Sequence, residues 1–174
     1  MDVSLPRSLQ NNGMSRAINI SLLAELTSRT TMVEIVNRQR QRKIDAKQWS
    51  EFAEKALEAA SKDKSNATIV FVSDRAIKEL NRRFRGQNYA TDVLSFPSEA
   101  APFEVENQSL LGDVVISVQR AAAQAKEHRL SFENEIAQLI LHGLLHLSGY
   151  DHETDQGEMN RLELRLRKRL GIDQ

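Results

Sequence analysis

Residues 142–152 read HGLLHLSGYDH and place three of the four histidines of this chain within eleven residues. Residues four apart on an α-helix project from the same face, so His142 and His146 can bind one metal ion together. Gly149 can end that helix in the left-handed conformation, after which the chain turns back and brings His152 as a third ligand. Three protein ligands leave the fourth position of a tetrahedral zinc ion open for water or substrate. The spacing therefore predicts a hydrolytic metal site on a central helix.

The residues around these histidines predict that the helix is buried. Apolar residues such as Ile136, Ile140 and Leu144 occupy almost every face of it. Two buried imidazoles on one face without a shared partner would be costly, and a metal ion supplies that partner. This argument favours ligands over the simpler interpretation of hydrogen-bonded core histidines. The chain contains no cysteine, so histidine is the obvious ligand type, and three imidazoles suit zinc, although nickel or copper would fit them too.

The residue after the first histidine excludes one common chemistry. Zinc peptidases with the sequence His-Glu-x-x-His carry their general base at that position, where this chain has Gly143. The ligand spacing of the metzincins is present and their catalytic carboxylate is absent. Ordinary peptide hydrolysis by that mechanism is therefore not expected.

Composition limits the remaining possibilities. A chain of 174 residues is long enough for one domain with a real core, and its 24 basic and 24 acidic residues balance. The overall charge thus gives no reason to expect a membrane or a nucleic acid, DNA included, as a partner. Basic residues do cluster, and such runs usually form solvated faces; they lie at 38–43, 75–85 and 161–169. The lack of cysteine, of a secretory signal and of a long apolar stretch predicts a soluble cytoplasmic protein.

The order of the expected elements favours an α+β fold. Residues 1–31 read as a polar N-terminal extension, partly disordered, and Met32 is a plausible alternative start for a single catalytic domain over 32–174. The strands expected around 92–96 and 110–117 are joined by a loop without a helix, which disfavours a purely parallel sheet. Two earlier strands are expected at 33–36 and 67–72. Helices are expected from Asp45 to about 60, from Ser73 to about 84, after Ser117, after Ser131, and from about 155 to 170.

Two further stretches, LNRRFRGQNYATDVLSFP (80–97) and LGDVVIS (111–117), accompany HGLLHLSGYDH. Together the three motifs resemble the YbeY family of ribosomal RNA maturation factors, in the same order and over roughly residues 32–170. The resemblance implies a small four-stranded mixed sheet packed against helices, with one zinc ion on His142, His146 and His152. It also implies a catalytic arginine in the upstream motif, which corresponds to Arg85.

The same resemblance implies a function. Members are single-strand-specific endoribonucleases that act in 3′-end maturation of 16S ribosomal RNA and in ribosome quality control. Ribosomal RNA and the small ribosomal subunit with its proteins would then be the partners. This chain departs from the family where Asn88 and Ala90 replace an acidic residue and a proline, so the loop before Thr91 is where its shape is expected to differ.

The residue chemistry is compatible with that function. Zinc lowers the pKa of bound water towards ~7, which makes hydroxide available at neutral pH. A guanidinium such as that of Arg85 remains protonated and matches two phosphate oxygens at once. Two alternatives stay open: a non-enzymatic ribosome-assembly factor with a structural zinc, and a metal-dependent hydrolase of another substrate.

Several nearby residues have two plausible roles. Asp151 can orient a ligand histidine through its free ring nitrogen, or cap the final helix. Glu135 lies two helical turns before His142 on the same face and can serve as a base or hydrogen-bond partner, although a first-turn carboxylate that favours the helix N-terminus is the preferred interpretation. His128 is expected to be a solvated histidine at a helix end. Met159 is expected in the helix core, not beneath the metal.

Overall fold

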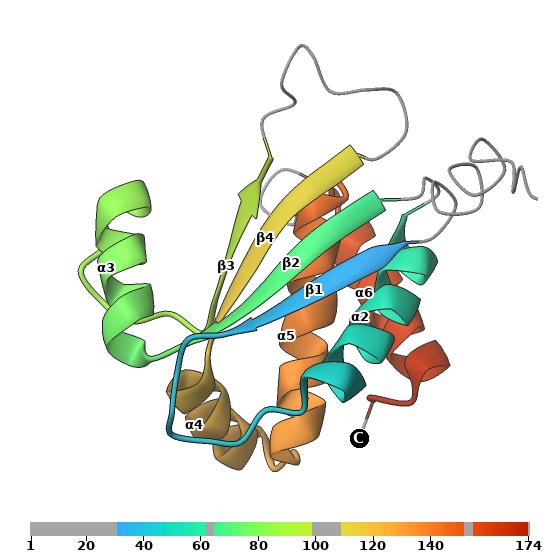
Figure 1. Cartoon of the computed structure of the whole chain (residues 1–174). Helices are drawn as coiled ribbons and strands as arrows, with labels where there is room; N and C mark the ends of the chain where they lie inside the picture. Colours follow the sequence, from blue (N-terminus) through green and yellow to red (C-terminus); the bar gives the residue numbers. More distant parts are fainter. Residues whose placement is uncertain (1–30, 62–64, 99–108, 152–154, 174) are drawn as a thin grey trace, which may run out of the picture. The chain divides into compact units, whose positions relative to one another are not determined.

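A four-stranded mixed sheet forms the centre of the computed structural model, which describes residues 31–61, 65–98, 109–151 and 155–173. The strand order is β1-β2-β4-β3 (Figure 1). β1 and β4 both pair with β2 in parallel, and β3 pairs antiparallel with β4 along one edge. The predicted α+β class and four-stranded mixed sheet are therefore confirmed. The strands are β1 (Met32–Asn37), β2 (Ser65–Val72), β3 (Val93–Pro97) and β4 (Ser109–Ser117).

Five helices surround this sheet in the described part of the chain. Helices α2, α5 and α6 lie together on one side of it, whereas α3 lies apart from them near β3 (Figure 1). They are α2 (Ala46–Ala60), α3 (Asp74–Arg85), α4 (Val118–His128), α5 (Phe132–Leu147) and α6 (Glu158–Leu170).

The helix starts follow local capping chemistry. The side chains of Asp45, Ser73, Ser117 and Ser131 each accept a hydrogen bond from a backbone N–H in the first turn of α2, α3, α4 and α5. Such caps satisfy donors that a helix end leaves unpaired. All four starts predicted from these residue types are confirmed.

Helix α6 begins later than the sequence predicted, at Glu158 and not near Asp155. The carboxylate of Asp155 accepts hydrogen bonds from the backbone N–H groups of Gly157 and Met159, each at 2.7 Å. Asp155 thus holds the turn that leads into the helix instead of forming its first residue. Met159 is 1% exposed and belongs to the main core, as predicted.

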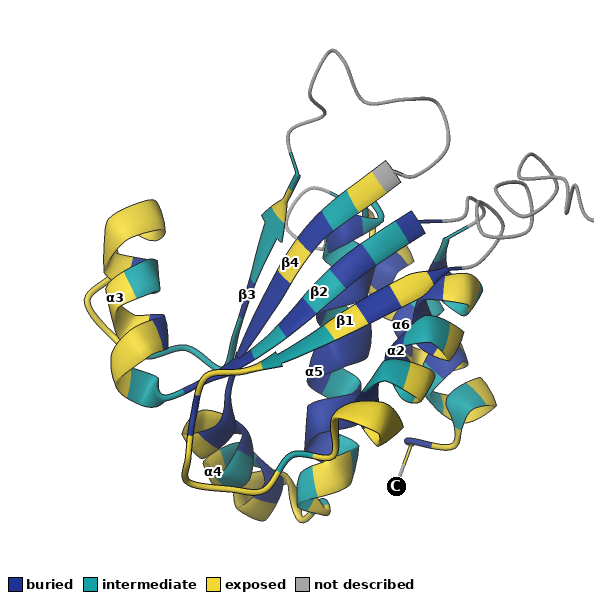
Figure 2. Cartoon of the chain, in the orientation of Figure 1, coloured by how far each residue is buried: buried dark blue, intermediate teal, exposed yellow. Residues whose placement is uncertain are grey.

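Helix α5 lies in the centre of the main core (Figure 2). Alternate residues of β4 serve opposite faces of the sheet, because strand side chains alternate. Val114 and Ile116 join the core formed with α5, whereas Val115 packs with Ile77 in a smaller cluster beneath α3. Full burial of one such aliphatic side chain stabilises the fold by roughly 1.5–3 kcal/mol. Packing on the two faces of β2 and β4 thus fixes α5 and α3 relative to these two strands.

Within the described ranges, no helix has the length and apolar character that crossing a membrane requires. Of the predicted extension at 1–31, only Thr31 lies among the described residues.

Candidate functional site

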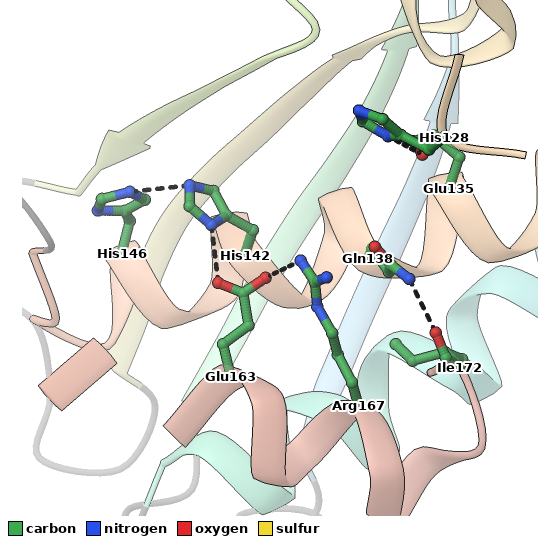
Figure 3. A network of polar contacts seen from close by, with 8 residues as sticks. All are labelled: His128, Glu135, Gln138, His142, His146, Glu163, Arg167 and Ile172. Carbon is green, nitrogen blue, oxygen red and sulfur yellow. Dashed lines mark hydrogen bonds and ion pairs between the residues drawn. The ribbon is translucent and has the colours of Figure 1, made fainter. Parts of the chain in front are cut away.

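The C-terminal half of α5 brings His142 and His146 together, as their spacing predicted. Their Nε2 atoms are 3.2 Å apart and their ring centroids 4.7 Å apart, with an angle of 79° between the rings (Figure 3). Gly149 follows the helix with a φ of 89°, and the backbone N–H of Tyr150 reaches back to the carbonyl of Leu145 at 3.1 Å. This left-handed ending is the one predicted for Gly149.

The two imidazoles fit a shared metal ion. Two nitrogens bound to one tetrahedral zinc at ~2.0–2.1 Å would lie about 3.3 Å apart, close to the observed 3.2 Å. The predicted third ligand, His152, falls outside the described residues. Within the described ranges no group of three or more potential metal ligands occurs. The three-histidine zinc site therefore stays a prediction that the geometry of its first two members supports.

A buried carboxylate on α6 supports the first of these histidines. The Nδ1 atom of His142 lies 3.1 Å from Oε2 of Glu163, and the guanidinium of Arg167 pairs with the other carboxylate oxygen (Figure 3). Because a carboxylate accepts the Nδ1 proton, the lone pair of His142 is left on Nε2, the atom that faces His146. Glu163 thereby sets the tautomer that metal binding requires.

The charge state of Glu163 suits this role. Burial alone raises the pKa of its carboxyl group, but the hydrogen bond from His142 and the charge of Arg167 outweigh burial and hold this pKa below its ordinary value. The group is therefore an anion at neutral pH. Sequence reasoning missed both Glu163 and Arg167. The sequence held one signal for Glu163: it lies at helical spacing from Met159 and Leu166, so this acidic residue is on the face of α6 that enters the core.

The absence of a peptidase glutamate has a packing cause. A Cβ atom built on Gly143 would lie 2.4 Å from Cγ1 and 2.9 Å from Cγ2 of Val114. Both distances are far below normal contact. At this residue α5 lies directly against the side chain of Val114 in β4, so a glutamate would have to displace that side chain before it could act as a base.

The other predicted residues near the histidines are placed differently. Glu135 is 4% exposed and its Oε2 lies 3.2 Å from Nδ1 of His128, not beside His142 (Figure 3). His128 therefore has a buried partner, although its side chain is 56% exposed. The backbone carbonyl of Asp151 accepts a hydrogen bond from the N–H of Asp155, and the carboxylate at the start of α6 is that of Asp155. Neither predicted role of the Asp151 side chain is tested by these contacts.

Arg85 and the two histidines line one cavity of about 1220 Å³. The cavity runs beside the edge strand β3, and its walls include the C-terminal end of α3, the segment 87–91 and one side of α5. Arg167 also contributes to its wall. The predicted catalytic arginine and the two predicted metal ligands that the structure describes thus line the same cavity, although Arg85 and His142 are 57 residues apart in sequence.

Two hydrogen bonds fix the segment between α3 and β3. The side chain of Asn81, which is 3% exposed, donates to the carbonyl of Tyr89 at 3.0 Å. Arg120 of α4 donates to the carbonyl of Ala90, also at 3.0 Å. The loop that carries Asn88 and Ala90 is therefore held from two helices.

Comparison with known proteins agrees with the fold and the motifs. A curated relative from Alkaliphilus metalliredigens, "Endoribonuclease YbeY", is 51% identical over 100 residues, which are 55% of this chain and 64% of that protein. Another of the same name from Geobacter metallireducens is 36% identical over 141 residues, 80% of this chain and 94% of that protein. The solution structure of TM1509 from Thermotoga maritima matches with a TM-score of 0.56 and 30% identity, over 80% of this chain and 89% of that one.

A family profile matches a similar share of the chain. The profile described as "Endoribonuclease YbeY" matches residues 34–171, which include most of β1, the whole of α6 and every residue that lines the cavity except Asp173. The chain therefore belongs to the YbeY family of endoribonucleases.

Proposed function

We propose that this protein is a zinc-dependent endoribonuclease that cuts single-stranded RNA in the cytoplasm, with the 3′ end of 16S ribosomal RNA as its substrate. The observation that carries the proposal is the shared cavity, which is lined by His142, His146 and Arg85. Family membership supports RNA cleavage, and the ribosomal substrate rests on the resemblance of the three sequence motifs.

Three residues would hold the metal ion: His142 and His146 with His152. Bound zinc supplies positive charge and activation of water, the chemistry that hydrolysis of a phosphodiester needs. Glu163 contacts Nδ1 of His142 and so aims the opposite ring nitrogen, Nε2, at that site, and Arg167 keeps Glu163 in place. Orienting partners of this kind commonly raise metal affinity and activity.

Arg85 would bind the phosphate group to be cleaved. Arg85 lies in the last turn of α3, where any cation is stabilised by the negative end of the helix dipole. The helix dipole would favour lysine equally, so it does not explain an arginine beside the cavity. A guanidinium can contact two phosphate oxygens and oppose charge that develops on them. Arg167 pairs with Glu163 through Nη2. The other nitrogens of its guanidinium would be donors for a neighbouring phosphate.

The size of the cavity favours a polymer over a small molecule. Sites for small ligands usually enclose about 300–1,000 Å³, and this cavity is larger, at about 1220 Å³. Gly143 also argues against the peptidase alternative, since no general base fits at its position.

Metal analysis combined with RNA cleavage tests the proposal. The purified full chain should contain one equivalent of zinc and should cut a single-stranded fragment of 16S RNA. His146→Ala should lose both properties, and Arg85→Ala should lose cleavage while keeping zinc. Arg75→Ala is a matched control, because Arg75 is an exposed residue of the same helix outside the cavity. RNA binding without cleavage by the zinc-loaded wild type would favour the non-enzymatic assembly factor, and faster turnover of peptides or esters than of RNA would favour the other hydrolase.

A further inference from the structure

Exposed aromatic residues concentrate on one wall of the cavity. Phe84 is 58% exposed and Tyr89 is 56% exposed, and both line the cavity next to Arg85. The other large apolar residues that are exposed in the described part of the chain, Met32, Leu110 and Leu164, do not line it. Isolated exposed apolar residues need no explanation, but two aromatic rings beside a functional arginine do.

The ring of Phe84 and the backbone of Tyr89 are held in place, which favours a binding surface. The ring of Phe84 packs against that of Phe96 with centroids 5.2 Å apart at an angle of 70°, and the guanidinium of Arg83 lies 5.4 Å from its centroid. The backbone of Tyr89 is fixed by the bond from buried Asn81 to its carbonyl. Less conformational entropy is then lost when a ligand binds here than at a mobile loop.

The electrostatic surroundings indicate the ligand. Arg83 and Arg85 flank Phe84 in the last turn of α3, where the third basic residue, Arg82, pairs with Glu79. Arg85 and Arg167 also line the cavity. Aromatic faces next to a cationic groove are the usual surface for single-stranded nucleic acid, because every base has a π-face and every nucleotide carries a phosphate. A paired duplex keeps its bases stacked on each other and cannot offer them to such rings.

We propose that Phe84 and Tyr89 form a base-stacking subsite that binds the unpaired nucleobases next to the phosphate held by Arg85. This inference rests on the proposed function for the nature of the substrate. It assigns the preference for single strands to two named side chains, whereas the metal site and Arg85 contact only the phosphodiester. The subsite accepts any base, so it selects for unpaired structure and not for sequence.

A comparison of base-bearing and abasic RNA tests the subsite. The probes are a fluorescent oligouridine and an oligomer of the same length and charge with abasic riboses at its central positions. Binding is measured by anisotropy with the full chain carrying His146→Ala, so that the probe stays intact. Phe84→Leu and Tyr89→Leu keep apolar bulk but lack a π-face, and each should weaken oligouridine binding roughly 5- to 150-fold while hardly affecting the abasic probe.

Controls separate stacking from other effects. Phe84→Tyr and Tyr89→Phe should bind like the parent chain, and Leu164→Ala, an exposed apolar residue outside the cavity, should have no effect. The leucine variants should leave the salt dependence of binding unchanged, whereas Arg85→Ala should reduce its slope by about 0.7.

Two results would overturn the inference: an equal loss of affinity for both probes, which indicates a structural role, or no loss for either. The test does not depend on cleavage. If the zinc-loaded wild type binds oligouridine through these rings but cuts no RNA, the proposed function fails and the stacking subsite stands. If it cuts RNA and the leucine variants bind and cut normally, only the subsite fails.

Discussion

Nδ1 of His142 and Oε2 of Glu163 lie 3.1 Å apart, which joins the middle of α5 to the middle of α6 through a buried carboxylate. The contact places a negative charge directly behind the predicted zinc ligand. It also explains how an acidic residue can be stable in the core, since both of its oxygens are paired. This contact and those of Gly143, Asp155 and Asn81 can each be tested by substitution.

Glu163→Gln should weaken zinc binding about 10- to 100-fold, because an amide orients His142 less firmly and lacks the charge that makes the imidazole a better ligand. Competition with a chromophoric chelator measures the affinity. Glu158→Gln, the same change at an exposed position of the same helix, is the control. Unchanged affinity in Glu163→Gln would remove Glu163 from the metal site.

Gly143→Ala should destabilise the fold by about 1–3 kcal/mol, although alanine is the better helix former, because the new methyl group would collide with Val114. Urea unfolding measures the change. Val114→Ala opens space at the same contact, so the double variant should lose less stability than the two single changes added together. Strict additivity would show that the close approach of α5 to β4 is not the cause.

Asp155→Asn should flatten the acid dependence of stability. The hydrogen bond from the N–H of Met159, with that from Gly157, lowers the pKa of Asp155 below its ordinary value of 3.8. A group whose pKa is lower in the folded state stabilises the fold above its unfolded pKa, and this contribution is lost as the pH falls through the folded pKa. Urea unfolding between pH 5 and pH 2 should therefore show a steeper loss in the wild type. Parallel curves for the two proteins would contradict the assignment.

Asn81→Leu should reduce RNA cleavage more than its effect on stability explains. The substitution keeps the side-chain volume but removes the donor to the carbonyl of Tyr89. The bond from Arg120 to the carbonyl of Ala90 and the backbone bond from Gln87 to Asn81 then remain to hold the segment 86–91. We expect a stability loss of about 1 kcal/mol, with faster proteolysis confined to this segment. Arg120→Ala removes the second contact and should produce the same pattern. Normal cleavage in both variants would show that the segment needs neither bond.

The sequence predicted most of the fold because its signals were local. Asp45, Ser73, Ser117 and Ser131 cap helices through contacts within three residues. The spacing of His142 and His146 likewise depends on one helix alone. The sequence predicts the start of α6 too early, because an aspartate suits both the first turn of a helix and the turn that precedes it. The hydrogen bonds from the N–H groups of Gly157 and Met159 show that Asp155 lies in the preceding turn.

The parts that sequence reasoning missed depend on contacts between distant segments. Glu135 lies in the first turn of α5, as the preferred interpretation predicted, but the sequence does not reveal its partner His128, which comes from α4. Glu163 reaches His142 from a helix that begins 16 residues later, and no periodicity within either helix reveals which side chains meet. Gly143 was recognised as the missing base, whereas the reason for a glycine there lies in Val114 of β4.

The pairing of His142 with Glu163 also sets an order of assembly during synthesis. His142 leaves the ribosome 21 residues before Glu163 and 25 before Arg167, so a growing chain can form α5 and its sheet contacts while the imidazole still lacks its carboxylate. The orientation of that imidazole is completed only when α6 docks. A nuclease whose proposed substrate is ribosomal RNA thus acquires its organised site only once α6 has left the ribosome and docked on α5.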